Sequence, residues 1–421
     1  MKRTPHRLVR ATTAVAALSL ALVGLAGTTA SAAETRPLPA RTRFFTPAPD
    51  PGATAQVRDL LQTGQFRDAA RIAQLVATPQ AVWFTQGTPQ QVRHEVRATI
   101  RQAKRQHSVP TLVLYNVPGR DCSQYSSGGA GSDAAYRQWI DGVVAGLPKR
   151  GRVIVVVEPD GLANLPSDCP TAYPGQDVPA LTAGRIADIR YAGRQLTRAN
   201  RDALVYLDAG HSAWHSVGDM ASRLDQAGVR QLQGFSLNVS NYQPTPQLVQ
   251  YGNWISKCLS YAHNPAGGGV QLGHYDQCAS QYYPATVSDY STWHLTDEWY
   301  ASHVDQAPGA PSSRELAHFV IDTSRNGRGP WTPSAVYPDP QTWCNPPGRG
   351  LGLRPTGRTG SPLADAYLWI KTPGQSDGQC NRGVTGSTTD PEWGGIVDPA
   401  AGAWFDQQAL ELARLASPPL R

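Results

Sequence analysis

Beyond its first thirty or so residues, the 421-residue sequence lacks any apolar run long enough to span a bilayer. Its six cysteines include no Cys-x-x-Cys pair, which argues against a zinc or redox site. It also shows no internal repeat, no low-complexity linker and no separable second domain. These absences exclude a membrane-spanning chain and a repeat array, and we predict no metal and no cofactor.

The N-terminus has the pattern of a secretory signal peptide. Four basic residues precede an apolar run at positions 11–27, and small residues suited to cleavage follow at 30–32. Removal of residues 1–33 takes away four positive charges and no negative ones, so the formal net charge falls from +6 to +2. We therefore predict a secreted protein with no membrane segment, and the charge gives no reason to expect a nucleic-acid partner.

Export also decides how the cysteines and aromatic residues are interpreted. In an oxidising compartment six cysteines suggest up to three disulfides, with fifteen possible connectivities. Eleven Trp and sixteen Tyr stand against only seven Phe. Rings with an apolar face and a polar group suit sugar stacking as well as core packing.

Seven short apolar segments alternate with segments of helical periodicity. The clearest, Val153–Val157, has no polar alternation, as expected of a strand buried on both faces. The other predicted strands are 81–84, 111–115, 204–207, 234–238, 318–321 and 367–370, and the predicted helices are 58–76, 89–104, 134–147, 181–196 and 217–227. Alternating strands and helices imply parallel pairing with right-handed crossovers. We predict an α/β fold, a seven-stranded (β/α) barrel.

The barrel accounts for nearly all of the chain after the leader. We predict a single domain at 34–421, since no composition shift divides it. The Pro-rich segment 34–51 is expected to wrap the surface. The alternation of strands and helices is interrupted at residues 242–316, where few strands are predicted. We expect a long insertion there, held in place by Cys258 and Cys278.

Polar residues recur after the predicted strands, and taken singly each could be a cap or turn residue. They are Asp121, Asp160, Asp208, Asn238, Asp322, Arg325 and Asp377. In a barrel these positions converge on one face, which favours a shared active site. Several carboxylates with many aromatic residues suggest acid/base hydrolysis of a polysaccharide. Asp160 follows an apolar strand and lies near Glu158, and such surroundings raise the pKa of a general acid.

Three motifs point elsewhere, and we discount them. Gly374–Gly378 matches the G-x-S-x-G pattern of serine hydrolases, but no helix signal and no His follow it. His211 and His215 have i,i+4 spacing without the Glu of a zinc protease, and His94-Glu95 lacks a second His. Asn238-Val-Ser240 is a glycosylation sequon at a predicted strand end, inside the proposed cleft.

Seven motifs in order along the chain resemble glycoside hydrolase family 6, inverting cellulases that act on β-1,4-glucans. They are YNVPGRDC at 115–122, VEPDGLANL at 157–165, LDAGH at 207–211, NVSNY at 238–242, IDTSRNG at 321–327, WCNPPG at 343–348 and DAYLWIK at 365–371. The resemblance implies a distorted barrel with a cleft or tunnel roofed by two loops. It also implies a β-1,4-glucan or cello-oligosaccharide substrate.

The resemblance assigns roles to individual residues. Asp160 takes the position of the general acid and Asp121 that of the aspartate which raises its pKa and helps the water. Asp377 takes that of the candidate general base; alternatively, the proton leaves along a water chain that includes Ser127. Implied sugar contacts are Trp83, Tyr115, Asp208, His211, Trp214, Asn238, Trp343, Lys371 and Gln375. The chain departs from many relatives at one position, where they have Glu and this sequence has Gln375. The Gln side chain has a similar shape and can still form hydrogen bonds, but it carries no charge.

The resemblance further implies two disulfides that brace active-site loops, Cys122 with Cys169 and Cys344 with Cys380, which leaves Cys258 and Cys278 for the third. Endo action on an open cleft is favoured over a cellobiohydrolase with a loop-covered tunnel. The rival from another class is a non-catalytic glucan-binding protein, although the two intact aspartates argue against it. We expect a monomer.

Overall fold

The computed structural model describes Met1, residues 34–264 and residues 273–420, so the predicted signal peptide lies outside the described residues apart from Met1. Seven parallel strands form one sheet in sequential order. The strands are β1 (Val82–Phe84), β2 (Thr111–Leu114), β3 (Val153–Val157), β4 (Ala203–Asp208), β5 (Gly234–Leu237), β6 (His318–Asp322) and β7 (Ala364–Leu368). The predicted α/β class and the seven strands are confirmed, with β7 beginning three residues earlier than predicted.

The sheet curls until its first and last strands approach each other. The backbone N–H of Ala81 donates to the carbonyl of Trp369 at 2.9 Å. The indole N–H of Trp83 donates to the carbonyl of Ile370 at 2.8 Å. In the described chain no ladder pairs β1 with β7, so these two bonds close the curl without completing a regular barrel.

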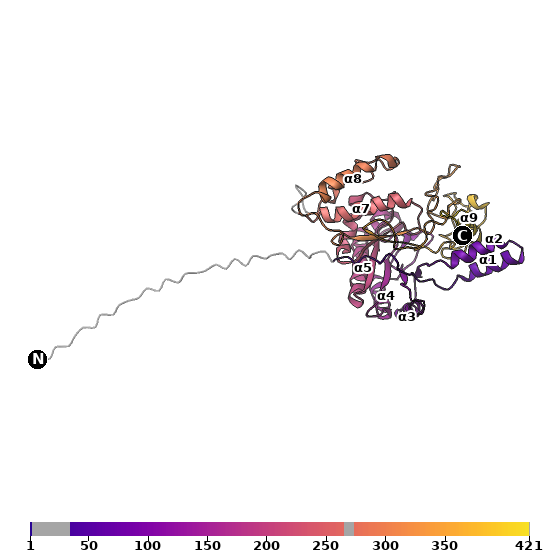
Figure 1. Ribbon diagram of the computed structural model, residues 1–421, viewed down its shortest axis with the longest axis horizontal. Coiled ribbons are helices and arrows are strands. Elements are labelled where there is room, and N and C mark those ends of the chain that lie inside the picture. Colours follow the sequence, from indigo (N-terminus) through magenta and orange to yellow (C-terminus); the bar gives the residue numbers. More distant parts are fainter. Residues whose placement is uncertain (2–33, 265–272, 421) are drawn as a thin grey trace. The chain divides into compact units, whose positions relative to one another are not determined.

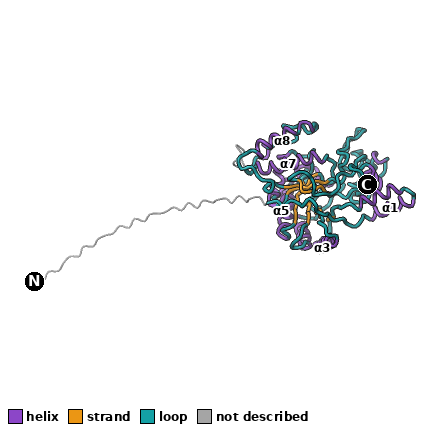
Figure 2. The backbone as a smooth tube through the Cα atoms, in the orientation of Figure 1, coloured by secondary structure: helices purple, strands orange, loops and turns teal. Residues whose placement is uncertain are grey.

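Helices follow most strands and cover the outside of the sheet (Figure 1; Figure 2). They are α1 (Pro51–Gln62), α2 (Phe66–Val76), α3 (Pro89–Arg105), α4 (Asp133–Gly146), α5 (Val178–Ala199), α6 (Val217–Gln226), α7 (Thr245–Tyr261), α8 (His294–Tyr300) and α9 (Asp406–Arg414). The single helix predicted over 58–76 is wrong. It is two helices, because the chain turns between α1 and α2 at Gly64, whose φ is +75°.

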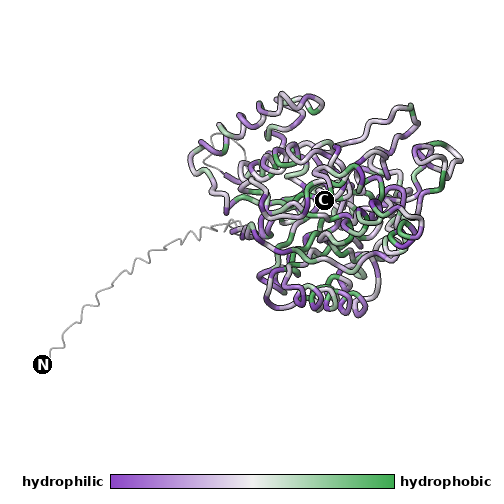
Figure 3. The backbone as a smooth tube through the Cα atoms, turned by 45° about the vertical axis from the view of Figure 1, so that its right-hand side comes forward, coloured by the Kyte–Doolittle hydropathy of each residue, from purple (hydrophilic) through white to green (hydrophobic). Residues whose placement is uncertain are grey.

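The core forms two layers, one on each face of the sheet. Val155 and Val157 face outward and pack with residues of the surrounding helices. Ile154 and Val156 face inward and pack against Tyr206 of β4. Burial on both faces explains the uninterrupted apolar run of β3, and Figure 3 shows hydrophobic colour along the strands and hydrophilic colour on the outer helices. A third cluster joins α1, α2 and α9 to Trp369.

The segment before α1 does more than wrap the surface. Leu38 and Phe44 are buried and belong to the inward-facing cluster of the sheet. Two backbone hydrogen bonds hold this segment beside Val109, from Phe45 N to Val109 O at 3.0 Å and from Val109 N to Arg43 O at 2.8 Å. The expectation of a purely surface segment is therefore wrong, because its apolar side chains fill the interior of the incompletely closed barrel.

The region predicted as an insertion begins with an ordinary crossover element. Helix α7 follows β5 and packs in the outer cluster, and α8 lies beside it (Figure 1). The remainder of 242–316 is mostly irregular where described, as expected. Cys258 on α7 is joined to Cys278, and the bonds Cys122–Cys169 and Cys344–Cys380 are also present, so all three predicted disulfides are confirmed.

None of the helices in the described residues is both long enough and apolar enough to cross a membrane.

Candidate active site

A cleft of about 380 Å³ opens where the strands end. Nine of the thirteen predicted catalytic and sugar-binding residues line it, and they come from loops after five different strands and from β1 itself. They are Trp83, Tyr115, Asp121, Asp160, His211, Trp214, Trp343, Lys371 and Asp377. The parallel order of the sheet explains the convergence, because every strand delivers its following loop to the same edge.

Asp160 lies three residues beyond the end of β3 in an unusual backbone conformation. Its φ is +63°, and Glu158 before it has a φ of +53°. Non-glycine residues rarely adopt such angles, and they concentrate at functional sites where the surroundings enforce them. The backbone N–H of Asp160 donates to the carboxylate of Asp208 at 2.9 Å, which fixes the turn. Within the described residues, no hydrogen bond occupies the Asp160 carboxyl itself.

Several causes favour the protonated form of the Asp160 carboxyl. Burial raises its pKa well above the usual value, and the negative charges of Asp208, Asp121 and Asp377 raise it further. Glu158 plays a different part from the one predicted, because its carboxylate accepts from the backbone N–H groups of Asn116 and Val117.

Asp121 faces Asp160 from the loop after β2 and is also held in a left-handed conformation, with φ at +60°. One of its oxygens accepts from the backbone N–H of Ser126 at 2.6 Å. Burial raises the pKa of Asp121 to about 6, against the opposing effects of that hydrogen bond and of the Arg120 charge. A carboxylate with such a pKa accepts a proton readily in mildly acidic water.

Asp377 has the opposite electrostatic setting. Arg325 donates to both of its oxygens, at 2.8 and 3.1 Å, and the Lys371 ammonium lies 3.0 Å away. The backbone N–H of Asn345 donates to it as well, at 3.0 Å. Burial alone would raise the pKa of Asp377, but the charges of Arg325 and Lys371 lower it to about 2. Asp377 is therefore a fixed negative charge and a poor proton acceptor.

Aromatic rings line the cleft around these carboxylates. Trp83 and Tyr115 meet edge to face with ring centroids 5.6 Å apart. Trp214 packs against the rings of His211 and His215, at 5.4 and 5.7 Å. All of these rings except Tyr115 are half-buried, so one face or edge of each remains exposed. Such faces suit the apolar faces of pyranose rings.

His211 is neutral in this environment. Burial lowers its pKa to about 4, and the nearby His215 contributes in the same direction. Its Nδ1 accepts from the backbone N–H of Ala213 at 3.2 Å, which leaves Nε2 as a donor toward the cleft.

Four predicted contact residues do not line the cleft. Ser127 is exposed beside it, and its neighbour Ser126 lines it instead. Asp208 is buried and bonded to the backbone of Asp160, so it supports the acid from behind. Asn238 is fully buried, and its side-chain N–H groups donate to the carbonyls of Asn241 and Asp322. Gln375 lines a neighbouring groove and donates to Asp50.

Sequence reasoning missed two positioning residues. Arg325 was placed with the residues expected at the active site but was given no role; it is fully buried and donates to both oxygens of Asp377. Asn345 exchanges two hydrogen bonds with Asp377, since its N–H donates to the carboxylate and its side-chain oxygen accepts from the Asp377 N–H at 2.8 Å. The available signal for Arg325 was its position shortly after the predicted strand 318–321, and for Asn345 it was membership of the motif WCNPPG at 343–348.

The discounted motifs have structural roles. Ser376 of the G-x-S-x-G pattern is fully buried and donates to the carbonyls of Gly378 and Pro399, so it is no nucleophile. His215 pairs with Asp219 at 2.8 Å. The side chain of Asn238 is buried, which excludes it as a glycosylation acceptor in the folded protein.

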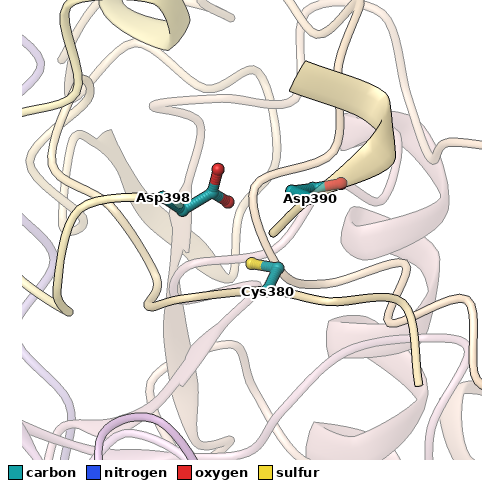
Figure 4. Close-up of side chains that lie close together, drawn as sticks. All are labelled: Cys380, Asp390 and Asp398. Carbon is teal, nitrogen blue, oxygen red and sulfur yellow. The ribbon is translucent and has the colours of Figure 1, made fainter. Parts of the chain in front are cut away.

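One cluster in the described chain has the composition of a metal site. The ligand atoms of Cys380, Asp390 and Asp398 lie within 4.8 Å of one another (Figure 4). The residues do not fit a metal ion, because the sulfur of Cys380 is bonded to Cys344 and the carboxylate of Asp390 is paired with Arg382. Burial raises the pKa of Asp398 to about 7, and the Asp390 charge adds to this. The protonated form of Asp398, which burial favours, can lie beside Asp390 without charge repulsion.

This cluster is connected to the cleft. Asn345, which holds Asp377, also donates to Asp398 at 2.8 Å. The loop after Asp377 is thus tied to the site by a continuous chain of buried hydrogen bonds.

Comparison with known proteins places the chain in a family. The model for "Glycosyl hydrolases family 6" matches residues 40–416. Endoglucanase A from Cellulomonas fimi is 34% identical over 356 residues, which is 84% of this chain and 58% of that protein. Endoglucanase 1 from Streptomyces halstedii is 34% identical over 80% of this chain and 83% of its own length.

A solved structure agrees with both. The endoglucanase Cel6 from Mycobacterium tuberculosis, in complex with methyl-cellobiosyl-4-deoxy-4-thio-β-D-cellobioside, superposes with a TM-score of 0.64 at 34% identity. The match covers 89% of this chain and 98% of that one. The chain spans less than two thirds of the length of the Cellulomonas relative. The family model covers nearly all of the described domain, and the seven-stranded fold and the carboxylate cleft agree with it: the chain belongs to glycosyl hydrolase family 6.

Proposed function

We propose that this protein is a secreted β-1,4-glucanase that cleaves β-1,4-glucosidic bonds with inversion at the anomeric carbon. The observation that carries the proposal is Asp160, an acid with a raised pKa and an unoccupied carboxyl, in a cleft lined by aromatic rings. Family membership supports the same reaction, as does the cellobioside complex of the mycobacterial relative.

In the proposed reaction Asp160 gives its proton to the glycosidic oxygen as the bond to the anomeric carbon breaks. A water molecule attacks that carbon from the opposite face and loses a proton, so the products are two shorter chains. Asp121, with a pKa of about 6, is the acceptor that the surroundings favour, directly or through water. Asp377, held by Arg325 and Lys371, supplies negative charge to the oxocarbenium-like transition state rather than taking the proton.

The aromatic residues bind and orient the substrate. Trp83 and Trp214 are half-buried rings of the cleft wall that can stack on sugars, and Tyr115 contacts Trp83 and lies near the carboxylates of Asp160 and Asp121. His211 and Lys371 offer N–H donors to sugar hydroxyls. This arrangement fits a linear polymer of glucose that passes along the cleft.

Endo action is the form of this function that we favour, in keeping with the endoglucanase relatives. One observation favours the cellobiohydrolase alternative. Tyr125, on the loop after β2, approaches the Trp343 ring to 5.9 Å and donates to Asn381 at 3.2 Å, so the two disulfide-braced loops touch beside the cleft. Contact between these loops is what a covered tunnel requires.

Hydrolysis of carboxymethylcellulose tests the function and its mode together. Viscosity and reducing ends are followed in parallel for the wild type and for Asp160→Ala. A fast fall in viscosity per reducing end supports endo action, and release of cellobiose with little change in viscosity supports the tunnel alternative. Equal rates for wild type and variant would refute the assignment of Asp160.

A further inference from the structure

A second groove begins on the far side of Trp83. It has a volume of about 280 Å³, and Trp83 lines both this groove and the cleft. Thr372 and Gln375 form part of its wall and belong to the loop that also carries Lys371 and Asp377 into the cleft. The two cavities therefore share a side wall and a loop, and the groove continues the cleft at its Trp83 end.

The opposite wall comes from a distant part of the chain. Residues 47–51, just before and at the start of α1, face Gln375 across the groove. Trp404 also lines the groove, and it packs so closely that a Cβ at Gly52 would meet the Cβ of Trp404, and one at Gly374 its indole ring, each at 2.5 Å. The groove is thus a built feature in which three separate segments are fixed against one another.

Asp50 and Gln375 meet across this groove. The Gln375 side-chain N–H donates to one oxygen of Asp50 at 3.0 Å, and the other oxygen caps α1 by accepting from Gly52 N at 2.7 Å. The side-chain oxygen of Gln375 and the hydroxyl of Thr372 have no hydrogen-bond partner among the described residues, although both residues line the groove. A carboxylate, a free amide oxygen, a free hydroxyl and two indole rings form the kind of surface that binds a sugar.

We propose that this groove binds a further glucosyl residue of the substrate, beyond the one that contacts Trp83 from the cleft, and that Asp50 is a specificity-determining residue of this subsite. The inference rests on the proposed glucanase function. It also explains the departure noted in the sequence. The carboxylate that Gln375 lacks is supplied by Asp50, and the amide of Gln375 is oriented by it.

The subsite predicts a dependence on substrate length. A cello-oligosaccharide long enough to reach past Trp83 gains the contacts with Asp50 and Gln375, whereas a shorter one does not. Loss of Asp50 should therefore weaken binding of long chains selectively, by about tenfold for the loss of one to two hydrogen bonds.

The test compares cellohexaose with cellotriose in four proteins: wild type, Asp50→Ala, Asp50→Asn and Asp59→Asn. Asp59 is an exposed acid on the same helix and serves as the matched control. Asp50→Asn retains a side-chain oxygen for the helix cap, so it separates loss of charge from loss of the cap. Thermal unfolding verifies that each variant is folded, and kcat/KM is measured on both substrates.

The proposal predicts that the ratio of kcat/KM on cellohexaose to that on cellotriose falls about tenfold in Asp50→Ala, falls partially in Asp50→Asn and is unchanged in Asp59→Asn. An unchanged ratio in Asp50→Ala would overturn the subsite while leaving the glucanase function intact. Absence of hydrolysis by the wild type would refute the function itself. Binding of cellohexaose to Asp160→Ala, with and without Asp50→Ala, then decides the subsite independently of turnover: an unchanged Kd overturns it.

Discussion

The proposed reaction depends on three aspartates that lie in different electrostatic environments. Burial and neighbouring negative charge raise the pKa of Asp160 well above its usual value, the pKa of Asp121 is raised to about 6, and that of Asp377 is lowered to about 2. Environments that separate the pKa values of identical groups give them separate roles. At the scale of the residue, the acid, the proton acceptor and the fixed charge are therefore distinguished by their partners.

Substitution of Asp160 should affect substrates according to their leaving groups. Asp160→Asn removes the proton donor, so kcat on cello-oligosaccharides should fall about 10²- to 10⁴-fold. An aryl cellobioside with an acidic phenol needs little protonation, so its cleavage should fall much less. Steady-state kinetics on the two substrates measures the difference. An equal loss on both would show that Asp160 acts in binding or folding instead of acid catalysis.

The pH profile gives a second prediction. The alkaline limb of kcat/KM reports deprotonation of Asp160, and the Asp121 charge is one of the causes that raise the pKa of Asp160. Asp121→Asn removes that charge, so the pKa of Asp160 falls and the alkaline limb should move to lower pH, along with a loss of rate. Profiles from pH 4 to 9 for wild type and variant test this. A limb that stays in place or moves to higher pH contradicts the electrostatic account.

At the scale of elements, the region after β5 is coupled to the cleft through buried side chains, among them Tyr251, whose hydroxyl donates to the carbonyl of His215 at 2.9 Å. Gln281 is fully buried and donates to the carbonyls of Ser212 and His215, at 3.0 and 2.8 Å, on the loop that carries His211 and Trp214. The segment that contains Gln281 therefore holds in place the loop that carries His211 and Trp214.

Gln281→Ala should leave the Ser212 carbonyl without its donor and the His215 carbonyl with only the Tyr251 hydroxyl, and it should destabilise the fold by about 1–3 kcal/mol. Because the loop that presents Trp214 loses support, KM for cello-oligosaccharides should rise more than kcat falls. Urea unfolding and steady-state kinetics provide the two readouts. Gln277→Ala, at an exposed position nearby, is the matched control and should change neither. A loss of stability with KM unchanged would separate this segment from the cleft.

The strands and helices also show which parts of the fold can be predicted from the sequence. The strands could be predicted because a parallel sheet covered on both faces demands continuous apolar runs such as Val153–Val157, and the site followed because polar residues come directly after those runs. The break between α1 and α2 was missed, since helical periodicity continues across Gly64. The interior position of Phe44 was hidden by its Pro-rich surroundings.

Contacts between loops were beyond prediction from residue types. Asp50 and Gln375 are 325 residues apart, and nothing in either segment indicates the other. The same holds for Asn345 with Asp377, because the contact exists only once the disulfide-braced loop has folded back. Sequence patterns identify which side chains reach the cleft edge, whereas the partners that tune them depend on how the loops pack.

At the scale of the whole molecule, buried acids should make the fold more stable in mild acid than in mild base. Burial raises the pKa of Glu158, Asp208 and Asp398 to about 7 and that of Asp188 to about 6. In the unfolded chain these groups titrate near 4. Their contribution is therefore fully present below about pH 4 and is lost as the pH rises toward 7.

Acids with lowered pKa oppose this trend only at lower pH. Asp377, with a pKa of about 2, contributes stability that is present above about pH 4 and lost below it. We therefore expect a higher Tm at pH 5 than at pH 8, and a smaller difference in Asp398→Asn, because Asn resembles the protonated acid. Differential scanning calorimetry at both values measures the effect. A higher Tm at pH 8 contradicts this account of the buried acids.

The measurement that tests the central claim most directly is time-resolved proton NMR of cellohexaose hydrolysis by the wild-type protein. One record shows both whether β-1,4-glucosidic bonds are cleaved and which anomer forms first. The account predicts cleavage with the α-anomer as the initial product, because inversion converts a β-linkage into an α-hemiacetal. Initial formation of the β-anomer would contradict the single-displacement mechanism, and the absence of cleavage would contradict the glucanase function.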